Sequence, residues 1–300
     1  MNIVVTGGSG FVGVNLCQSL VETGHTVTAL GTRSRHPLEK REGFRYLQAD
    51  TARPGPWQKS IGQMDAAVNL AGRTIFHRWT KAYKEEIYNS RIRTTQNLVK
   101  AITGERPVVL VSTSAVGYYG DRGEREIAED TPAGSDFLAR VSKDWEAEAL
   151  AAKAKGARVA VTRFGVVLGE GGGALEKMVP AFKMMAGGPI GDGKQWFPWI
   201  HLKDVISGIQ FLLENETANG PYNFVSPGAV RNKEFVKALA AVLHRKAVVP
   251  VPALIVRAAL GEMASTVLAS QRCRPERLIS AGFTFQYPDV SVALKALTRP

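Results

Sequence analysis

Several features that mark other classes of protein are scarce in this chain of 300 residues. Its two cysteines, Cys17 and Cys273, are too few for a disulfide framework or a cysteine-ligated metal site. No run approaches the roughly 18 uninterrupted apolar residues that cross a membrane, and no signal peptide precedes the first strand-like run. These absences predict a cytoplasmic protein that binds neither a metal ion nor a membrane.

Acidic residues are also in deficit, because 38 Lys and Arg against 27 Asp and Glu give a net charge of +11. The cations are spread along the chain, and no basic run is interleaved with aromatic residues, so nucleic-acid binding is not expected. The charge instead favours a small anionic partner, such as the phosphates of a cofactor or substrate.

The most informative pattern lies at the start of the chain. The apolar run Ile3–Val5 is followed by the glycine-rich turn Thr6–Gly13 and then by an amphipathic stretch over residues 14–21. Between a strand and a helix, this glycine spacing is that of a dinucleotide-binding loop, with a plain tight turn as the alternative. The helix N-terminus would then hold the cofactor phosphates. The predicted binding residues are Gly7, Gly10, Phe11, Val12 and Gly13.

Strand-like and helical runs alternate through the first 170 residues. The expected strands are Ile3–Thr6, Thr26–Leu30, Phe44–Gln48, Ala66–Leu70, Val108–Ser112 and Arg158–Phe164. Helical patterns cover Lys81–Ile102 and Asp136–Lys155. This alternation predicts parallel βαβ units and therefore an α/β fold with a doubly wound parallel sheet of the Rossmann type.

After Gly169 the sequence becomes rich in glycine and loops. Helices are expected at Ala174–Met185, Asn232–His244 and Pro252–Ser270, and a strand at Gly282–Tyr287. This composition predicts a smaller C-terminal substrate lobe. The dinucleotide-binding domain would span 1–168 plus about 199–224, and the lobe would span 169–198 and 225–300.

Five segments carry a resemblance to a known superfamily: Thr6–Gly13, Val68–Gly72, Val111–Gly120, Arg163–Gly169 and Trp199–Val205. Together they resemble the extended short-chain dehydrogenase/reductases of the sugar-nucleotide epimerase type. Segments near Trp79, Phe137 and Trp145, and the tail from Leu260 to Phe283, are similar to a narrower branch. That branch comprises atypical NAD(P)-dependent epimerase-like proteins with their own C-terminal domain.

The end of the second expected strand bears on cofactor choice. In NAD-binding folds an acidic residue there bonds the ribose 2′-hydroxyl, but residues 29–35 contain none. Thr32, Arg33 and Ser34 offer a guanidinium and two hydroxyls suited to a 2′-phosphate. The alternative is that Arg33 and Arg35 are solvated loop cations. The sequence thus predicts NADP.

The resemblance implies further cofactor contacts and a catalytic set. It places Asp50 near the adenine and Leu70, Ala71 and Gly72 behind the nicotinamide ribose. It also implies a Ser that bonds the reacting oxygen and a Tyr-x-x-x-Lys pair. There the Tyr exchanges a proton, and the Lys lowers the pKa of that Tyr and binds the ribose.

This chain departs from that catalytic set at two positions. Ser114 and Lys143 match the Ser and the Lys, but Ala139 stands at the Tyr position and Arg91 where an Asn is usual. Another phenol, Tyr118 or Tyr119, could be the proton donor. Alternatively, Arg91 and Lys143 polarise a substrate oxygen, or the protein binds NADP without turnover. The catalytic candidates are Ser114, Lys143, Arg91 and Tyr118.

The leading functional prediction is an NADP-dependent oxidoreductase or epimerase for a small, sugar-derived or phosphorylated substrate. The alternative is a non-catalytic NADP-binding regulator, and the sequence is compatible with a homodimer. His201 and Asp204 are expected to anchor a turn against the sheet, and Arg163 to be a buried structural or substrate-binding cation.

Overall fold

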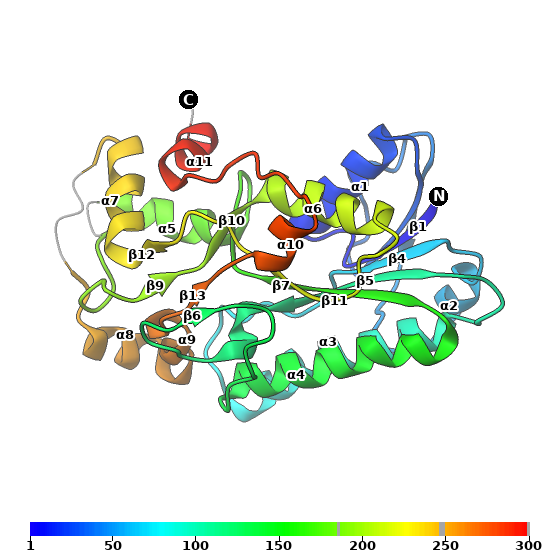
Figure 1. Cartoon of the computed structure of the whole chain (residues 1–300), viewed down its shortest axis with the longest axis horizontal. Helices are drawn as coiled ribbons and strands as arrows, with labels where there is room; N and C mark the ends of the chain where they lie inside the picture. Colours follow the sequence, from blue (N-terminus) through cyan, green and yellow to red (C-terminus); the bar gives the residue numbers. More distant parts are fainter. Residues whose placement is uncertain (185–186, 246–249, 299–300) are drawn as a thin grey trace.

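The computed structural model describes residues 1–184, 187–245 and 250–298 (Figure 1). Its centre is a seven-stranded parallel sheet of order β11-β7-β5-β4-β1-β2-β3. The strands are β1 (Asn2–Thr6), β2 (Thr26–Gly31), β3 (Phe44–Gln48), β4 (Ala66–Asn69), β5 (Val109–Ala115), β7 (Arg158–Phe164) and β11 (Gly220–Phe224). Central strands such as β4 are buried throughout, as expected where helices cover both faces. The predicted doubly wound sheet is confirmed.

Helices cover the sheet on both sides (Figure 1). On one face α1 (Phe11–Glu22) packs beside α6 (Leu202–Glu214). On the other lie α2 (Trp57–Ser60), α3 (Lys81–Ala101) and α4 (Phe137–Leu150). The loops that follow the parallel strands therefore share one edge, where α/β sheets bind ligands at the reversal of strand order. Here the order reverses between β1 and β4.

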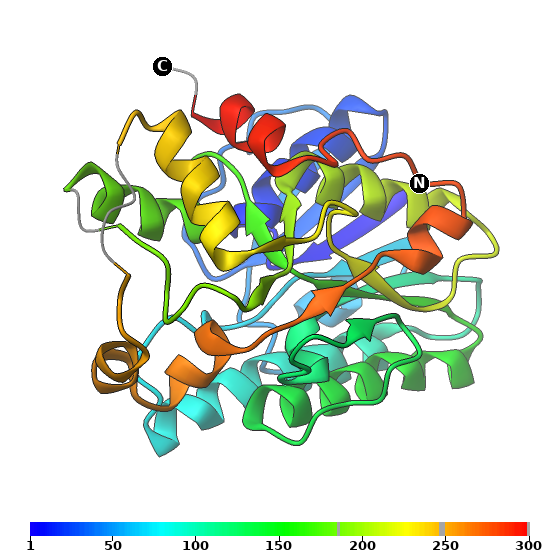
Figure 2. The same cartoon turned by 60° about the vertical axis from the view of Figure 1, so that its left-hand side comes forward.

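The C-terminal lobe lies beside this edge of the sheet, and three short strands of the preceding chain, β6 (Glu126–Ile127), β8 (Val166–Leu168) and β10 (Trp199–His201), pair with it or pack beside it (Figure 2). The short strand pairs are β8 with β10, β9 (Trp196–Phe197) with β12 (Val230–Arg231), and β6 with β13 (Arg272–Cys273). The helices of the lobe are α5 (Gly173–Lys183), α7 (Asn232–Val242), α8 (Ala253–Leu260), α9 (Ala264–Leu268) and α11 (Val290–Leu297), whereas α10 (Glu276–Ser280) packs against β11 of the sheet. Among the described residues, no helix combines the length and the apolar character that crossing a membrane requires.

Two expectations for the lobe are wrong. The predicted helix Pro252–Ser270 is broken into α8, a 3₁₀ turn (Gly261–Met263) and α9, because Gly261 has a φ of 60° that ends α8. No strand is present at Gly282–Tyr287, all of whose residues the structure describes. The predicted helix end at Met185 lies outside the described residues.

In the segment Gly282–Tyr287, a carboxylate binds backbone N–H groups in place of a partner strand. Asp204 accepts hydrogen bonds from the backbone N–H groups of Gln286 and Tyr287 at 2.7 and 3.0 Å. The His201 ring stacks on Tyr287 with centroids 3.8 Å apart, and its Nδ1 accepts from the Lys203 N–H at the start of α6. His201 and Asp204 are therefore structural anchors, but they hold the C-terminal segment onto α6 instead of a turn against the sheet.

Candidate functional site

Glycines give the loop between β1 and α1 its shape, as Gly7 and Gly13 show. Gly7 has a φ of 69°, and a Cβ on it would lie 2.8 Å from the backbone of Leu70 and Ala71. A Cβ on Gly13 would lie 2.3 Å from the Gly7 carbonyl oxygen. Side chains at these two positions would therefore push apart the β1 and β4 loops or separate α1 from its loop.

Gly10 differs from these two glycines. Its φ is −81°, and a Cβ on it would meet only the Gly7 carbonyl oxygen within 4 Å, at 3.1 Å. Gly10 is also the N-cap of α1 and supplies no side-chain cap. The N–H groups of the first turn of α1 are thus available to an anion, the arrangement by which a helix N-terminus binds phosphate.

The other predicted cofactor residues lie around this loop. Thr32, Arg33 and Ser34 are exposed directly after β2, and the neighbouring Gly31 lies against Ser9 of the β1 loop. Asp50 is exposed beyond β3 and pairs with Arg53 at 3.4 Å. The structure thus brings the loops after β1, β2 and β4 to one edge. The individual contacts of these residues with a cofactor stay predictions.

A buried polar network lies behind the end of β5. Ser114 Oγ donates to Glu146 Oε1 at 2.7 Å, and Arg163 makes two bonds of 2.8 Å to the same carboxylate. All three residues are at most 7% exposed. Burial by itself lowers the pKa of Arg163, but the bonds and charge of Glu146 raise it above its ordinary value. Ser114 is therefore a member of a buried ion-pair network, and its hydroxyl proton is used in the hydrogen bond to Glu146.

The two tyrosines after β5 have different environments. Tyr119 is buried; its hydroxyl donates to Asn223 at 2.6 Å and accepts from Arg163 at 2.8 Å. Burial raises the pKa of Tyr119, so its phenol is a poor proton-exchange group. Tyr118 is half-buried, with its ring 3.6 Å from the Arg163 guanidinium. In the described part of the chain its hydroxyl has no hydrogen-bond partner, which makes Tyr118 the better candidate.

Arg91 supports the turn after β4. Its guanidinium donates to the carbonyl oxygens of Arg73 and Ile87 at 3.0 Å and lies 5.2 Å from the Trp145 ring. A Cβ on Gly72 would come within 3.1 Å of it. Burial lowers the pKa of Arg91 to about 10, so it stays charged at neutral pH. Its bonds hold the predicted ribose-binding turn, and its catalytic role stays a prediction.

Lys143 lies on the exposed side of α4. Across the residues that the structure covers, its ammonium makes no ion pair or hydrogen bond. The buried face of the helix presents Ala139, Ser142 and Glu146 instead. The structure thus brings Ser114 and Tyr118 together through Arg163, and it leaves Lys143 and Arg91 outside that network. The catalytic assignments of Lys143 and Ser114 also stay predictions.

Sequence reasoning gave no role to Glu146, which organises this network. A signal was present, because Glu146 lies seven residues after Ala139 and three before Ala149, on the apolar face of α4. A carboxylate on a buried face needs a cation. Arg163, near the end of the mostly apolar strand β7, was a candidate, since the strand's other arginine, Arg158, stands at its first residue.

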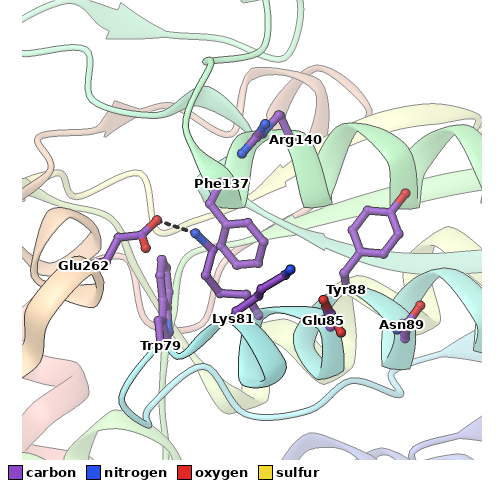
Figure 3. A pocket seen from close by; sticks show the side chains of 9 residues that line it. Trp79, Lys81, Glu85, Tyr88, Asn89, Phe137, Arg140 and Glu262 are labelled. Carbon is purple, nitrogen blue, oxygen red and sulfur yellow. Dashed lines mark hydrogen bonds and ion pairs between the residues drawn. The ribbon is translucent and has the colours of Figure 1, made fainter.

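A separate groove of about 550 Å³ lies where α3, α4 and the C-terminal lobe meet (Figure 3). The Lys84 side chain spans the groove: its Nζ donates a hydrogen bond to Glu262 at 2.6 Å and lies 4.6 Å from the centre of the Phe137 ring. Beneath it Trp79, Ile87 and Met263 form a small apolar core. These contacts join the lobe to the first turns of α3 and α4.

Comparison with known proteins agrees with this architecture. Residues 3–225 match the NAD dependent epimerase/dehydratase family. The chain belongs to that family. Residues 251–297 match a domain of unknown function, DUF1731. The predicted resemblance to epimerase-like short-chain dehydrogenase/reductases with their own C-terminal domain is thereby confirmed.

Similar proteins come from distant organisms. The chain is 42% identical to the chloroplastic epimerase family protein SDR39U1 homolog of Arabidopsis thaliana, over 99% of this chain and 86% of that one. It is 39% identical to the epimerase family protein YfhF of Bacillus subtilis, covering 99% and 98%. Human SDR39U1 isoform 2, crystallised with NADPH, superposes with a TM-score of 0.86 at 33% identity, covering 99% of each chain.

Proposed function

We propose that this family member binds NADP(H) across the loops after β1, β2 and β4 and acts as an oxidoreductase or epimerase. The uncapped first turn of α1 would hold the pyrophosphate. Arg33, with Thr32 and Ser34, would meet the 2′-phosphate at a strand end that has no acidic residue. The superposition with the NADPH-bound human protein supports this choice of cofactor.

The environment of Tyr118 is the observation that supports the proposed oxidoreductase or epimerase activity. Its half-buried ring lies on Arg163, and the absence of a partner for its hydroxyl within the described residues leaves that group available to a substrate. NADP(H) would supply or accept the hydride, and the Tyr118 hydroxyl would exchange the accompanying proton with a substrate oxygen.

Ser114 would help to position the substrate on which Tyr118 acts. Because its proton is bonded to Glu146, its oxygen can accept a hydrogen bond but has none to donate. It would therefore orient a substrate hydroxyl rather than polarise a carbonyl. The net charge of +11 supports a small anionic substrate, sugar-derived or phosphorylated.

The test compares wild type with Tyr118→Phe, following NADPH oxidation with a carbonyl panel and NADP⁺ reduction with sugar nucleotides and sugar phosphates. Loss of a positioned acid/base should lower kcat by roughly 10²- to 10⁴-fold with little change in KM. Tyr88→Phe is the matched control, because that hydroxyl bonds Asp144 between α3 and α4. Unchanged kcat in Tyr118→Phe would overturn the role of Tyr118 as proton donor and favour the electrostatic alternative.

A second candidate function is NADP binding without turnover. It is favoured by the alanine at position 139 and by the exposed position of Lys143. This candidate predicts tight NADPH binding with no oxidation across the same panel.

A further inference from the structure

Side chains on β3 that are not expected to contact the cofactor hydrogen-bond to the backbone of the loop after β2. The Tyr46 hydroxyl on β3 donates to the Arg33 carbonyl oxygen at 2.7 Å, and Gln48 Nε2 donates to the Thr32 carbonyl oxygen at 3.3 Å. The exposed side chains of Thr32, Arg33 and Ser34 therefore project from a backbone that is fixed on its inner side.

His36 fixes the far end of the same loop. It is 4% exposed and packs against Phe44 and Tyr46, with ring centroids 4.6 and 5.2 Å away. Its Nδ1 accepts from the Leu38 N–H at 3.1 Å, which assigns the proton of the neutral ring to Nε2. Nε2 then donates to the Gly8 carbonyl oxygen at 3.2 Å. His36 thus ties the loop after β2 to the phosphate-binding loop after β1.

We infer that Tyr46 and His36 are positioning residues for cofactor choice, holding the Thr32–Ser34 loop in the shape that receives a phosphate monoester on the cofactor ribose. The inference rests on the proposed binding of NADP(H). A loop that is already ordered loses little conformational entropy when it closes on a ligand. Since NADH lacks the 2′-phosphate, loosening this loop should weaken NADPH binding and leave NADH binding unchanged.

Calorimetric titration of NADPH and NADH into wild type and Tyr46→Phe tests this directly. The substitution removes one hydroxyl and keeps the ring against His36, so NADPH should bind roughly 3- to 10-fold more weakly, the usual worth of one hydrogen bond. Tyr83→Phe is the matched control. The Tyr83 hydroxyl makes an equivalent 2.6 Å bond to the Thr74 carbonyl oxygen, in a different loop, so the ratio of the two affinities should not change.

Arg33→Ala separates failure of the inference from failure of the proposed function. It should lower NADPH affinity by about 10- to 100-fold, the worth of a charged hydrogen bond. If wild type itself shows no preference for NADPH, both proposals fall. If Arg33→Ala abolishes the preference while Tyr46→Phe keeps it, the positioning role is overturned and NADP binding stands.

His36→Phe provides a second variant, since it keeps the aromatic packing and removes both hydrogen bonds of the ring. A larger loss for NADPH than for NADH supports the inference. An equal loss for both cofactors would assign His36 to the phosphate loop alone and overturn its part in selectivity. Should this variant fail to fold, Tyr46→Phe still decides the question.

Discussion

The loop after β1 and the end of β5 lie at the same edge of the sheet, yet they are built in different ways. The first presents backbone N–H groups and depends on glycines, and its residues 7–13 are buried or partly buried. The second is a buried network in which Ser114, Glu146 and Arg163 satisfy one another. A family that keeps its cofactor can therefore preserve the first region while it replaces the chemistry of the second.

The difference has an energetic consequence. Gly10 can change with a small local adjustment, because a Cβ there meets only the Gly7 carbonyl oxygen within 4 Å, at 3.1 Å. Glu146 cannot be replaced without a loss of stability, because Arg163 would then be a buried cation without its counterion. Substitutions in the cofactor region should mainly change affinity, whereas substitutions behind β5 should mainly change stability.

The largest effect is expected for Glu146→Ala, which should lower the free energy of unfolding by about 3–5 kcal/mol. Urea denaturation measures the loss. Glu148→Ala is the matched control on the same helix, because its carboxylate is half-buried and bonds Gln96; it should cost about 1 kcal/mol or less. Similar losses in the two variants would show that the network is not what sets the two regions apart.

A smaller effect, confined to binding, is expected for Gly10→Val. The side chain would occupy the space of the pyrophosphate and remove two or more charge-assisted hydrogen bonds, so NADPH affinity should fall by about 100-fold or more. The melting temperature without cofactor should stay near that of wild type. Gly62→Val, in a turn where a Cβ makes only an ordinary contact at 3.6 Å, is the control. Retained NADPH affinity in Gly10→Val would place the cofactor elsewhere.

The two regions also differ in how well the sequence predicts them. The glycine spacing and the alternation of strands and helices predicted the sheet, because backbone geometry ties those residues to one conformation. The strand expected at Gly282–Tyr287 failed because Asp204, more than 80 residues away along the chain, satisfies that backbone.

The catalytic region was less predictable for a related reason. The four-residue spacing from Ala139 to Lys143 joins a buried position on α4 to an exposed one, so the spacing alone does not identify the proton donor. The pairing of Glu146 with Arg163 joins a helix to a strand, and no local pattern specifies such a contact. Side chains that meet only in three dimensions therefore decide the chemistry at the end of β5.

Hydrogen–deuterium exchange of the wild-type protein with NADPH and with NADH tests the central claim most directly, since one experiment reports on every loop. With NADPH, exchange should slow over residues 7–13, 32–36 and 70–73, the loops after β1, β2 and β4. With NADH, the first and last should be protected and residues 32–36 should not. Protection that misses residues 7–13, or that appears instead along the groove between α3 and α4, would contradict the account.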